Sequence, residues 1–591
     1  MNIRFSMTLI WITLLLGIAT SCSTKPDKAS LTIYCTSDVH GTLFDYDLKR
    51  DKEAPSSLAN VSEYMKEARK AENSSGIILL DNGDFLQGQP SNYYANFIDT
   101  NNVNIVAQIM NYLQYDAASI GNHDIEAGHP VYDKIVNQFR FPWLSANTIN
   151  TQTGEPYFKP YTVIERNGIK IAILGMTTPG IPKWLPRYLW NGLEFADMIE
   201  TANKWVSIIQ EKEKPDVLIG LFHSGVDYNY AGENENTPKN ENAGVLVAQQ
   251  VDGFDVVILG HDHREFVEEI TNNAGHKVVI FNPKSHATFL GKITIDLTKD
   301  GDRYNKTYQT ELIKLADIAK DTAYINKFTP ELDAIKTFVN MPLGEFTAPL
   351  SGRDGLFGPS AFTDFIHNAQ LSVTDADISF STVLQMDALI KAGVITMRDM
   401  FNLYSYENGL YTMTFSGAEI DKYLEYAYSL QYNTMKSEND HLLNFKADAE
   451  GNPVKNNRDQ YELAAPFFNY SCAAGIKYIV DVAQEPGNRV TITSMSDGTP
   501  FDENKTYKVA INSYRGNGGG GHLTQGIGLS KEEMENRIVE IKPKDVRFYI
   551  TEYIKQKGTV TPECRNDWKV VPEKYFQKGK AKDYQLIYEG H

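Results

Sequence analysis

Seven side chains of the kinds that bind divalent metal ions occur in five short clusters along the chain. Each cluster follows an apolar run of strand length, and the seven residues are Asp38, His40, Asp84, Asn122, His223, His261 and His263. Parallel strands bring their carboxyl ends to one edge of a sheet, so ligands that are distant in the chain can meet there. The five clusters therefore predict a metal centre at the edge of a sheet.

The chemical groups of the ligands limit which metal ions this site would bind. They offer carboxylate, amide and imidazole groups and no thiolate, which suits borderline divalent ions such as Zn, Mn or Fe(II). A carboxylate that bridges two ions about 3.5–4 Å apart would create a two-metal hydrolytic centre. Any one of the twelve histidines is more readily a core or surface residue, but five ordered clusters favour a metal site.

The clusters read DVHG, NGDF, GNHD, FHSG and GHDH, and in this order they resemble the motifs of the calcineurin-like metallophosphoesterases. The chain beyond residue 22 is similar to the two-domain 5′-nucleotidase family. The resemblance implies an α/β (α+β) fold, with an N-terminal four-layer sandwich and a C-terminal substrate-binding α/β domain. It also implies two ions, the first held by Asp38, His40 and His263, the second by Asn122, His223 and His261, and both bridged by Asp84.

The resemblance also implies a catalytic group. His123 falls on the family's catalytic histidine, and a carboxylate behind its ring would hold its tautomer. In many 5′-nucleotidases this carboxylate is an Asp three residues further on, where this chain has Glu126, while Asp124 directly follows His123. We favour Glu126 and keep Asp124 as the alternative. The implied mechanism is attack of a metal-bound hydroxide on phosphorus, with His123 stabilising the developing charge or protonating the leaving group.

The C-terminal domain is expected to bind the substrate, because the family holds a nucleobase between two aromatic side chains there. Tyr406 in LYSYENGL and Tyr514 in INSYRGNGGGGH occupy the positions of this pair, and Arg515 would add a contact to the nucleotide. From Ile378 the chain reads ISFSTVLQMDAL, where many 5′-nucleotidases carry Asn-Gly-Gly and a nucleotide-binding Arg. This departure makes the chain most similar to the 2′,3′-cyclic-nucleotide 2′-phosphodiesterase/3′-nucleotidase branch.

The expected function is therefore hydrolysis of 2′,3′-cyclic nucleotides and 3′-nucleotides to nucleoside and phosphate. A 5′-nucleotidase is the near alternative, and a dimanganese thiosulfohydrolase-like enzyme is a more distant one. A non-catalytic envelope binding protein is disfavoured because none of the seven ligands is missing. The net charge of −18 argues against binding of a nucleic-acid polymer, which requires a basic surface.

The N-terminal segment is expected to direct export. Residues 1–21 combine a short charged start with a hydrophobic stretch of signal-peptide length, and small residues lead to Cys22. The pattern resembles a bacterial lipobox, so Cys22 is predicted to be the lipidated start of a periplasmic or cell-envelope lipoprotein, with 22–30 as its tether. An ordinary secretory signal or an uncleaved anchor is the alternative.

The rest of the chain must supply the elements that position these groups. At 591 residues it is too long for one core. Residues 31–311 alternate strand-like runs with five helical segments, followed by strand-like runs without helices between them, which predicts a mixed sheet. Residues 312–344 are interpreted as a connector helix and 345–591 as the second domain. The helical segments are 57–71, 102–113, 130–139, 195–213 and 242–251.

Overall fold

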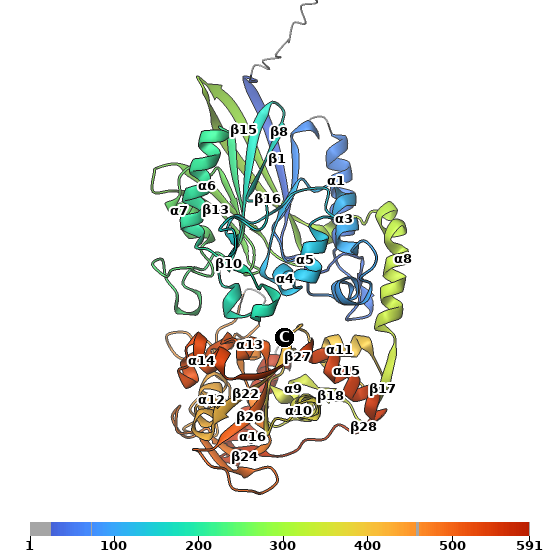
Figure 1. Ribbon diagram of the computed structural model, residues 1–591, viewed down its shortest axis with the longest axis vertical. Helices are drawn as coiled ribbons and strands as arrows, with labels where there is room; N and C mark the ends of the chain where they lie inside the picture. Colours follow the sequence, from blue (N-terminus) through green and yellow to red (C-terminus); the bar gives the residue numbers. More distant parts are fainter. Residues whose placement is uncertain (1–24, 72–73, 457–459, 590–591) are drawn as a thin grey trace, which may run out of the picture.

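The computed structural model describes residues 25–71, 74–456 and 460–589, and the expected signal peptide and Cys22 lie outside these ranges. The chain forms two domains, one above the other in Figure 1, with helix α8 running along one side between them. Strand β1 begins at Lys28, so the last residues of the expected tether 22–30 already belong to a sheet. Within the described ranges, no helix is long and apolar enough to cross a membrane.

The N-terminal domain contains two six-stranded sheets, with strand orders β16-β15-β1-β4-β5-β6 and β13-β14-β12-β11-β9-β8. Both sheets are mixed as predicted, since β1 pairs parallel with β4 and antiparallel with β15, and β14 pairs parallel with β12 and antiparallel with β13. The first sheet comprises Arg303–Lys314, Phe289–Asp300, Lys28–Thr36, Ile77–Asp81, Ala117–Ser119 and Trp143–Leu144. The second comprises Glu265–Thr271, Lys277–Pro283, Val256–Ile258, Val217–His223, Ile169–Thr177 and Tyr161–Arg166.

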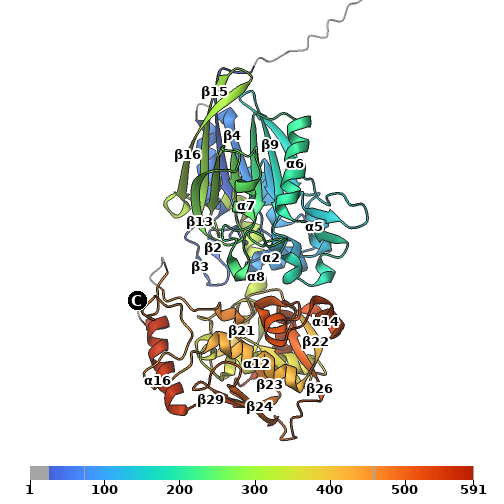
Figure 2. The ribbon, with the colours of Figure 1, turned by 90° about the vertical axis from the view of Figure 1, so that its left-hand side faces the viewer.

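Helices cover the outer face of each sheet and complete the predicted four layers (Figures 1 and 2). Helices α1 (Leu58–Lys70) and α3 (Ile105–Leu113) pack on the first sheet. Helices α6 (Met198–Lys212) and α7 (Gly244–Gln250) pack on the second. Asp197 caps the N-terminus of α6, because its carboxylate accepts the backbone N–H groups of Ile199 and Glu200.

Apolar side chains that point inward from the strands of both sheets form the layer between the two sheets. In β1, Leu31, Ile33 and Cys35 face the opposite sheet, whereas Tyr34 packs under the helices. All three inward residues are fully buried. Successive side chains of a strand point to opposite faces, so the same strand contributes to two apolar layers.

The connector between the domains is shorter than the expected helix over 312–344. Residues up to Lys314 complete β16, which pairs with β15 along its whole length. Helix α8 spans Thr322–Val339 and is capped by Asp321. Its buried residues recur at helical spacing and face the N-terminal domain; they are Tyr324, Phe328, Leu332, Ile335 and Val339.

The C-terminal domain is built on a five-stranded sheet of order β23-β19-β26-β22-β27. These strands are Cys472–Ala474, Ile378–Ser381, Thr506–Asn512, Gly409–Ser416 and Ile538–Asp545. Three long helices pack around it, namely α10 (Ala361–Val373), α12 (Gly417–Gln431) and α15 (Val546–Lys557). Two three-stranded sheets complete the domain, formed by Gly393–Thr396, Pro342–Phe346 and Thr559–Val560 and by Val490–Met495, Ile476–Asp481 and Trp568–Val571.

Candidate active site

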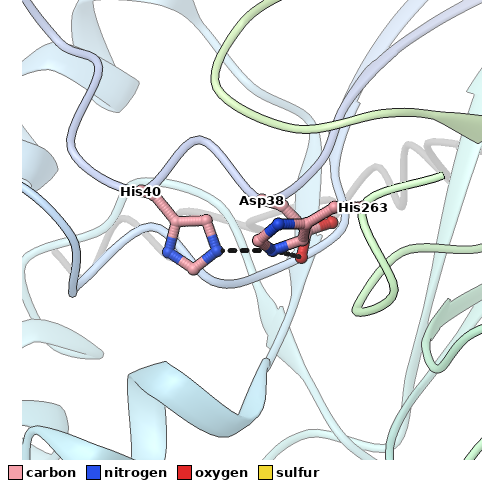
Figure 3. A group of neighbouring side chains, drawn as sticks. All are labelled: Asp38, His40 and His263. Atoms are coloured by element: carbon pink, nitrogen blue, oxygen red, sulfur yellow. Dashed lines mark hydrogen bonds and ion pairs between the residues drawn. The ribbon is translucent and has the colours of Figure 1, made fainter. Parts of the chain in front are cut away.

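The predicted ligands meet at the carboxyl ends of strands from both sheets, on the side of the N-terminal domain that faces the C-terminal domain. They form two groups in which three ligand atoms lie within 4.8 Å of one another. One group is Asp38, His40 and His263, shown in Figure 3, and the other is Asp84, His223 and His261. The first group has the same residues as the first set that the resemblance implied, and the second shares His223 and His261 with the other set but contains Asp84 in place of Asn122.

The backbone at these ligands is held in an unusual conformation. A positive φ costs a non-glycine residue about 1–3 kcal/mol, so the surrounding fold must impose it. Five of the seven ligands have one: Asp38 (50°), His40 (46°), Asp84 (59°), His261 (71°) and His263 (56°). The sharp turn after each strand aims the side chain at the centre instead of along the sheet.

The first group brings two imidazole rings together edge to face, with their centroids 4.8 Å apart and their planes at 63°. His40 Nε2 lies 2.9 Å from His263 Nε2, and His263 Nε2 lies 3.5 Å from Asp38 Oδ1. The backbone oxygen of Gln87 is 3.1 Å from His40 Nδ1 and accepts its proton, which leaves the Nε2 lone pair of His40 pointing at the centre. Converging nitrogen lone pairs beside a carboxylate are the donor set of a divalent ion.

Asp84 connects the two groups. Its Oδ1 accepts the backbone N–H of His123 at 2.8 Å. Its Oδ2 is 3.1 Å from His223 Nε2 and 3.9 Å from His40 Nε2, so it faces one histidine of each group. Within the described chain, this buried oxygen has no hydrogen-bond partner of acceptable geometry. A buried carboxylate oxygen without a donor is costly, and two cations sharing it would satisfy it.

Other contacts orient the second group. The backbone oxygen of Asn82 lies 2.7 Å from His223 Nδ1. His261 Nδ1 lies 2.8 Å from Asn122 Oδ1, while its Nε2 lies 3.2 Å from Glu241 Oε1. The seven residues therefore fit two divalent ions with Asp84 between them. Sequence reasoning missed Glu241 because no motif surrounds it.

His123 and Glu126 form a pair beside the centre. Glu126 Oε2 lies 2.5 Å from His123 Nδ1, so the favoured carboxylate is the one that holds the ring. Burial lowers the pKa of His123, but the charges of Asp84 and Glu126 outweigh it and raise that pKa to about 9. Because Nδ1 contacts Glu126, the other ring nitrogen of His123, Nε2, points away from that carboxylate.

Asp124 does not contact the His123 ring in this way. Its carboxylate is fully buried and accepts four backbone N–H groups, those of Asp84 (3.0 Å), Phe85 (3.1 Å), Leu86 (3.0 Å) and Gly121 (2.8 Å). These bonds shape the loop that carries Asp84. The geometry therefore distinguishes the two acids, with Glu126 on the imidazole and Asp124 on the backbone.

His286 is a further histidine of the site that the sequence did not predict. Its ring centroid lies 5.2 Å from that of His40 and 5.6 Å from that of His263. Its backbone N–H donates to Asp38 O at 2.8 Å, and burial lowers the pKa of its ring to about 4. His286 follows strand β14, as the other clusters follow strands, but no glycine stands beside it. For this reason the motif pattern did not identify His286 as a site residue.

Tyr406 and Tyr514 lie at the face of the C-terminal domain toward the metal ligands. Burial, with smaller contributions from Tyr514, Glu126 and Glu407, raises the pKa of Tyr406 to about 12. Tyr406 precedes Glu407, whose Oε2 accepts a hydrogen bond from Gln87 Nε2 of the N-terminal domain at 2.9 Å. Tyr514 donates its hydroxyl to Asn469 Oδ1 at 3.4 Å.

Arg515 has a different position from the one expected. The residue is 3% exposed. Its guanidinium donates within the domain to Asn469 Oδ1 (3.0 Å), Gly519 O (3.0 Å) and Phe468 O (2.7 Å). These bonds engage the donors that a direct contact to a nucleotide would need. Arg515 therefore braces the segment that holds Asn469 and Tyr514.

Comparison with protein families agrees with the geometry. Residues 31–265 match the calcineurin-like phosphoesterase model, and residues 342–525 match the 5′-nucleotidase C-terminal domain. The fold and the two ligand groups thus define a metallophosphoesterase, a metal-dependent hydrolase. The chain belongs to the 5′-nucleotidase family of these enzymes, which confirms the predicted family.

Named relatives span most of the chain. A 2′,3′-cyclic-nucleotide 2′-phosphodiesterase/3′-nucleotidase of Yersinia enterocolitica is 25% identical over 95% of this chain and 91% of its own. A trifunctional nucleotide phosphoesterase of Bacillus subtilis is 26% identical over 92% of this chain, which spans only 39% of that longer protein.

Solved structures share the two-domain fold. A Staphylococcus aureus structure in complex with alpha-ketoglutarate has a TM-score of 0.73 at 20% identity, covering 92% of this chain and 100% of that one. A 5′-nucleotidase precursor of Thermus thermophilus has a TM-score of 0.60 at the same identity and coverage. At this identity the likeness establishes the fold.

Proposed function

We propose that this protein is an exported, lipid-anchored phosphoesterase that hydrolyses 2′,3′-cyclic nucleotides and 3′-nucleotides to nucleoside and phosphate. The observation that carries the proposal is the pair of ligand groups that share Asp84, with His123 beside them. The name of the Yersinia relative supports the choice of substrate. The donor set favours Zn, Mn or Fe(II) as the two ions.

Divalent ions bound here would supply a Lewis acid and activate a water molecule at neutral pH. The chain's own residues position the reacting groups. The carbonyl groups of Gln87 and Asn82 set the tautomers of His40 and His223. Asp124 holds the loop that presents Asp84.

His123 acts as the proton donor or charge stabiliser of the reaction. The charges of Asp84 and Glu126 raise the pKa of the ring above its usual value, and Glu126 holds Nδ1 so that Nε2 points away from it toward a substrate. General acid catalysis of this kind contributes about 10²–10⁴ in rate. His123→Ala is expected to lower turnover by that order while leaving the metal content unchanged.

The nucleobase stacks between Tyr406 and Tyr514. Stacking of a base on an aromatic ring contributes about 1–3 kcal/mol, so Tyr406→Ala and Tyr514→Ala should each weaken kcat/KM for nucleotides by about tenfold or more. Arg515 acts on the nucleotide only through the position of Tyr514 and Asn469. A thiosulfohydrolase-like enzyme would not need this pair, so loss of nucleotidase activity in both variants would argue against that alternative.

The proposed anchor is a lipid on Cys22. Strand β1 starts at the end of the N-terminal domain that lies away from the C-terminal domain (Figure 1), so a tether there leaves the active site facing away from the membrane. Labelling with radioactive palmitate should mark the wild type and not Cys22→Ser. A wild type that takes up no label and fractionates with soluble proteins would contradict the anchor.

The substrate choice is tested by offering 2′,3′-cyclic AMP, 3′-AMP and 5′-AMP side by side, with Mn or Zn supplied. We expect hydrolysis of the first two at higher kcat/KM than 5′-AMP. A clear preference for 5′-AMP would make the protein a 5′-nucleotidase. No turnover of any of the three, with two ions bound per chain, would indicate a binding protein.

A further inference from the structure

A short hairpin of the N-terminal domain reaches across to the C-terminal domain. It is formed by β2 (Tyr46–Asp47) and β3 (Lys52–Glu53), and its turn carries Lys49 and Arg50. The backbone oxygen of Lys49 accepts a hydrogen bond from Asn402 Nδ2 at 3.2 Å, in helix α11 (Met397–Leu403). Asp51 also forms an ion pair with Arg398 of the same helix. The turn is therefore fixed against the C-terminal domain.

Residues 45–53 of this hairpin read DYDLKRDKE, and three of the four acids contact other groups. One of these contacts is an ion pair within the hairpin, where Asp47 Oδ2 is 3.5 Å from Arg50 Nη1. Asp47 Oδ1 accepts the backbone N–H groups of Lys49 and Arg50 at 3.0 Å each. Asp51 contacts Tyr46 and Arg398, and Glu53 lies 3.8 Å from Lys320.

The three bases of the hairpin line a cavity between the domains. The cavity has a volume of about 620 Å³, and Lys49, Arg50 and Lys52 form its N-terminal wall. Asp387 is the one acid among the residues that line it, and Tyr406 forms part of the opposite wall. A concentration of positive charge beside the proposed base-stacking tyrosine is notable in a chain of net charge −18.

Lys49 is the most buried of these cations. Its ammonium group has no hydrogen bond or ion pair with any residue that the structure describes, although the residue is half-buried. Burial and the charge of Arg547 lower the pKa of Lys49 to about 8. A partly desolvated cation without a partner gains most from an anion that enters the same cavity.

The cavity also lies close to the metal ligands. Tyr406 in its wall precedes Glu407, whose Oε2 accepts a hydrogen bond from Gln87 Nε2 at 2.9 Å. The backbone oxygen of Gln87 in turn lies 3.1 Å from His40 Nδ1. The same cavity is bounded by Tyr406. A nucleotide with its base on Tyr406 and one phosphoryl group at the metal ligands thus passes beside the three cations.

We propose that this cavity is a second anion site, which binds a phosphate of the substrate other than the one being hydrolysed. The preferred substrates are then nucleotides that carry a phosphate on both the 3′ and the 5′ oxygen of the ribose, such as nucleoside 3′,5′-bisphosphates. Water would cleave the 3′-ester of adenosine 3′,5′-bisphosphate to give 5′-AMP and inorganic phosphate. The inference rests on the proposed function and adds a substrate class to it.

The test compares kcat/KM for adenosine 3′,5′-bisphosphate with that for 3′-AMP. A charge-assisted contact from a half-buried group is worth about tenfold, so the wild type should prefer the bisphosphate by about tenfold or more. Lys49→Gln should bring the ratio close to one, and Lys49→Arg should restore most of it. Arg50→Gln should lower the ratio only about two- to threefold, because its side chain is 70% exposed.

Lys212→Gln, at the exposed end of α6, is the matched control and should leave both substrates unchanged. The preference should also fall as salt rises from 50 to 300 mM, since counterions screen an exposed anion site. Equal kcat/KM values for the two substrates in the wild type, insensitive to Lys49→Gln, would overturn the anion site and leave the proposed function standing. If neither substrate is hydrolysed with two ions bound, both proposals fail.

Discussion

The variant Asp124→Asn tests whether the Asp124 carboxylate supports the backbone around Asp84 or instead acts with His123 in catalysis. In the native site, Oδ1 accepts the N–H groups of Phe85 and Leu86, and Oδ2 accepts those of Asp84 and Gly121. Asparagine replaces one of these oxygens by an amide that can only donate. Two buried N–H groups then lose their acceptor, at about 1–3 kcal/mol each, so we expect a loss of about 4 kcal/mol in the free energy of unfolding.

This loss should appear in the thermal unfolding of the N-terminal domain. A loss of 1 kcal/mol lowers the thermal midpoint of a domain of this size by about 2 °C, so we expect the midpoint to fall by about 8 °C. The midpoint is measured by calorimetry in EDTA, so that metal binding does not contribute. Metal content, measured by mass spectrometry after reconstitution, should also fall because Asp84 loses its backbone support. Glu126→Gln is the comparison, with a midpoint within about 2 °C of the wild type, full metal content and lower turnover. If Asp124→Asn behaved like Glu126→Gln in all three measurements, Asp124 would be the partner of His123.

Three further outcomes are expected. Asp84→Asn should reduce metal content at both sites, because its Oδ2 faces a histidine of each group, and a variant that loses only one ion would contradict the bridge. Glu407→Gln should lower the unfolding free energy of the C-terminal domain by about 3–5 kcal/mol, because Arg547 is fully buried and pairs with Glu407 at 2.9 Å. Gln87→Leu removes one hydrogen bond to the Glu407 carboxylate but keeps the ion pair, so it should cost only about 1.5 kcal/mol in urea unfolding. Burial lowers the pKa of His367 to about 3, so the neutral ring stabilises the fold fully above pH 6.5 and progressively less as the pH falls toward 3. At pH 5 the free energy of unfolding should be lower by about 2 kcal/mol than at neutral pH because of this residue. Urea unfolding of His367→Gln as a function of pH should lack this decrease.

The local sequence was sufficient to predict a functional residue where its partner is a neighbour in the chain or where the residue directly follows a strand or lies in a helix. His123 and Glu126 lie within helix α4 (Asn122–Glu126), three residues apart, and that spacing places them on one face. The ligand clusters were visible because each follows a strand, and the apolar period marks where a strand ends. The α6 helix was predicted for the same reason, with bounds only a few residues too wide. The connector was predicted too long, because the exposed edge strand β16 lacks the apolar alternation that marks a strand.

Motif order and helical spacing in the sequence led to the family, to the seven candidate ligands and to Glu126 as the favoured partner of His123, with Asp124 as the alternative, because these patterns are properties of the local chain. How distant groups face one another depends on the folded chain. The tertiary structure turned the Asp124 carboxylate onto a loop about 40 residues away, engaged Arg515 within its own domain, and brought His286 to the first ligand group. It also placed Lys49 in the wall of a cavity between the two domains. Whether a polar group is satisfied depends on atoms that folding brings together, and no local pattern records that.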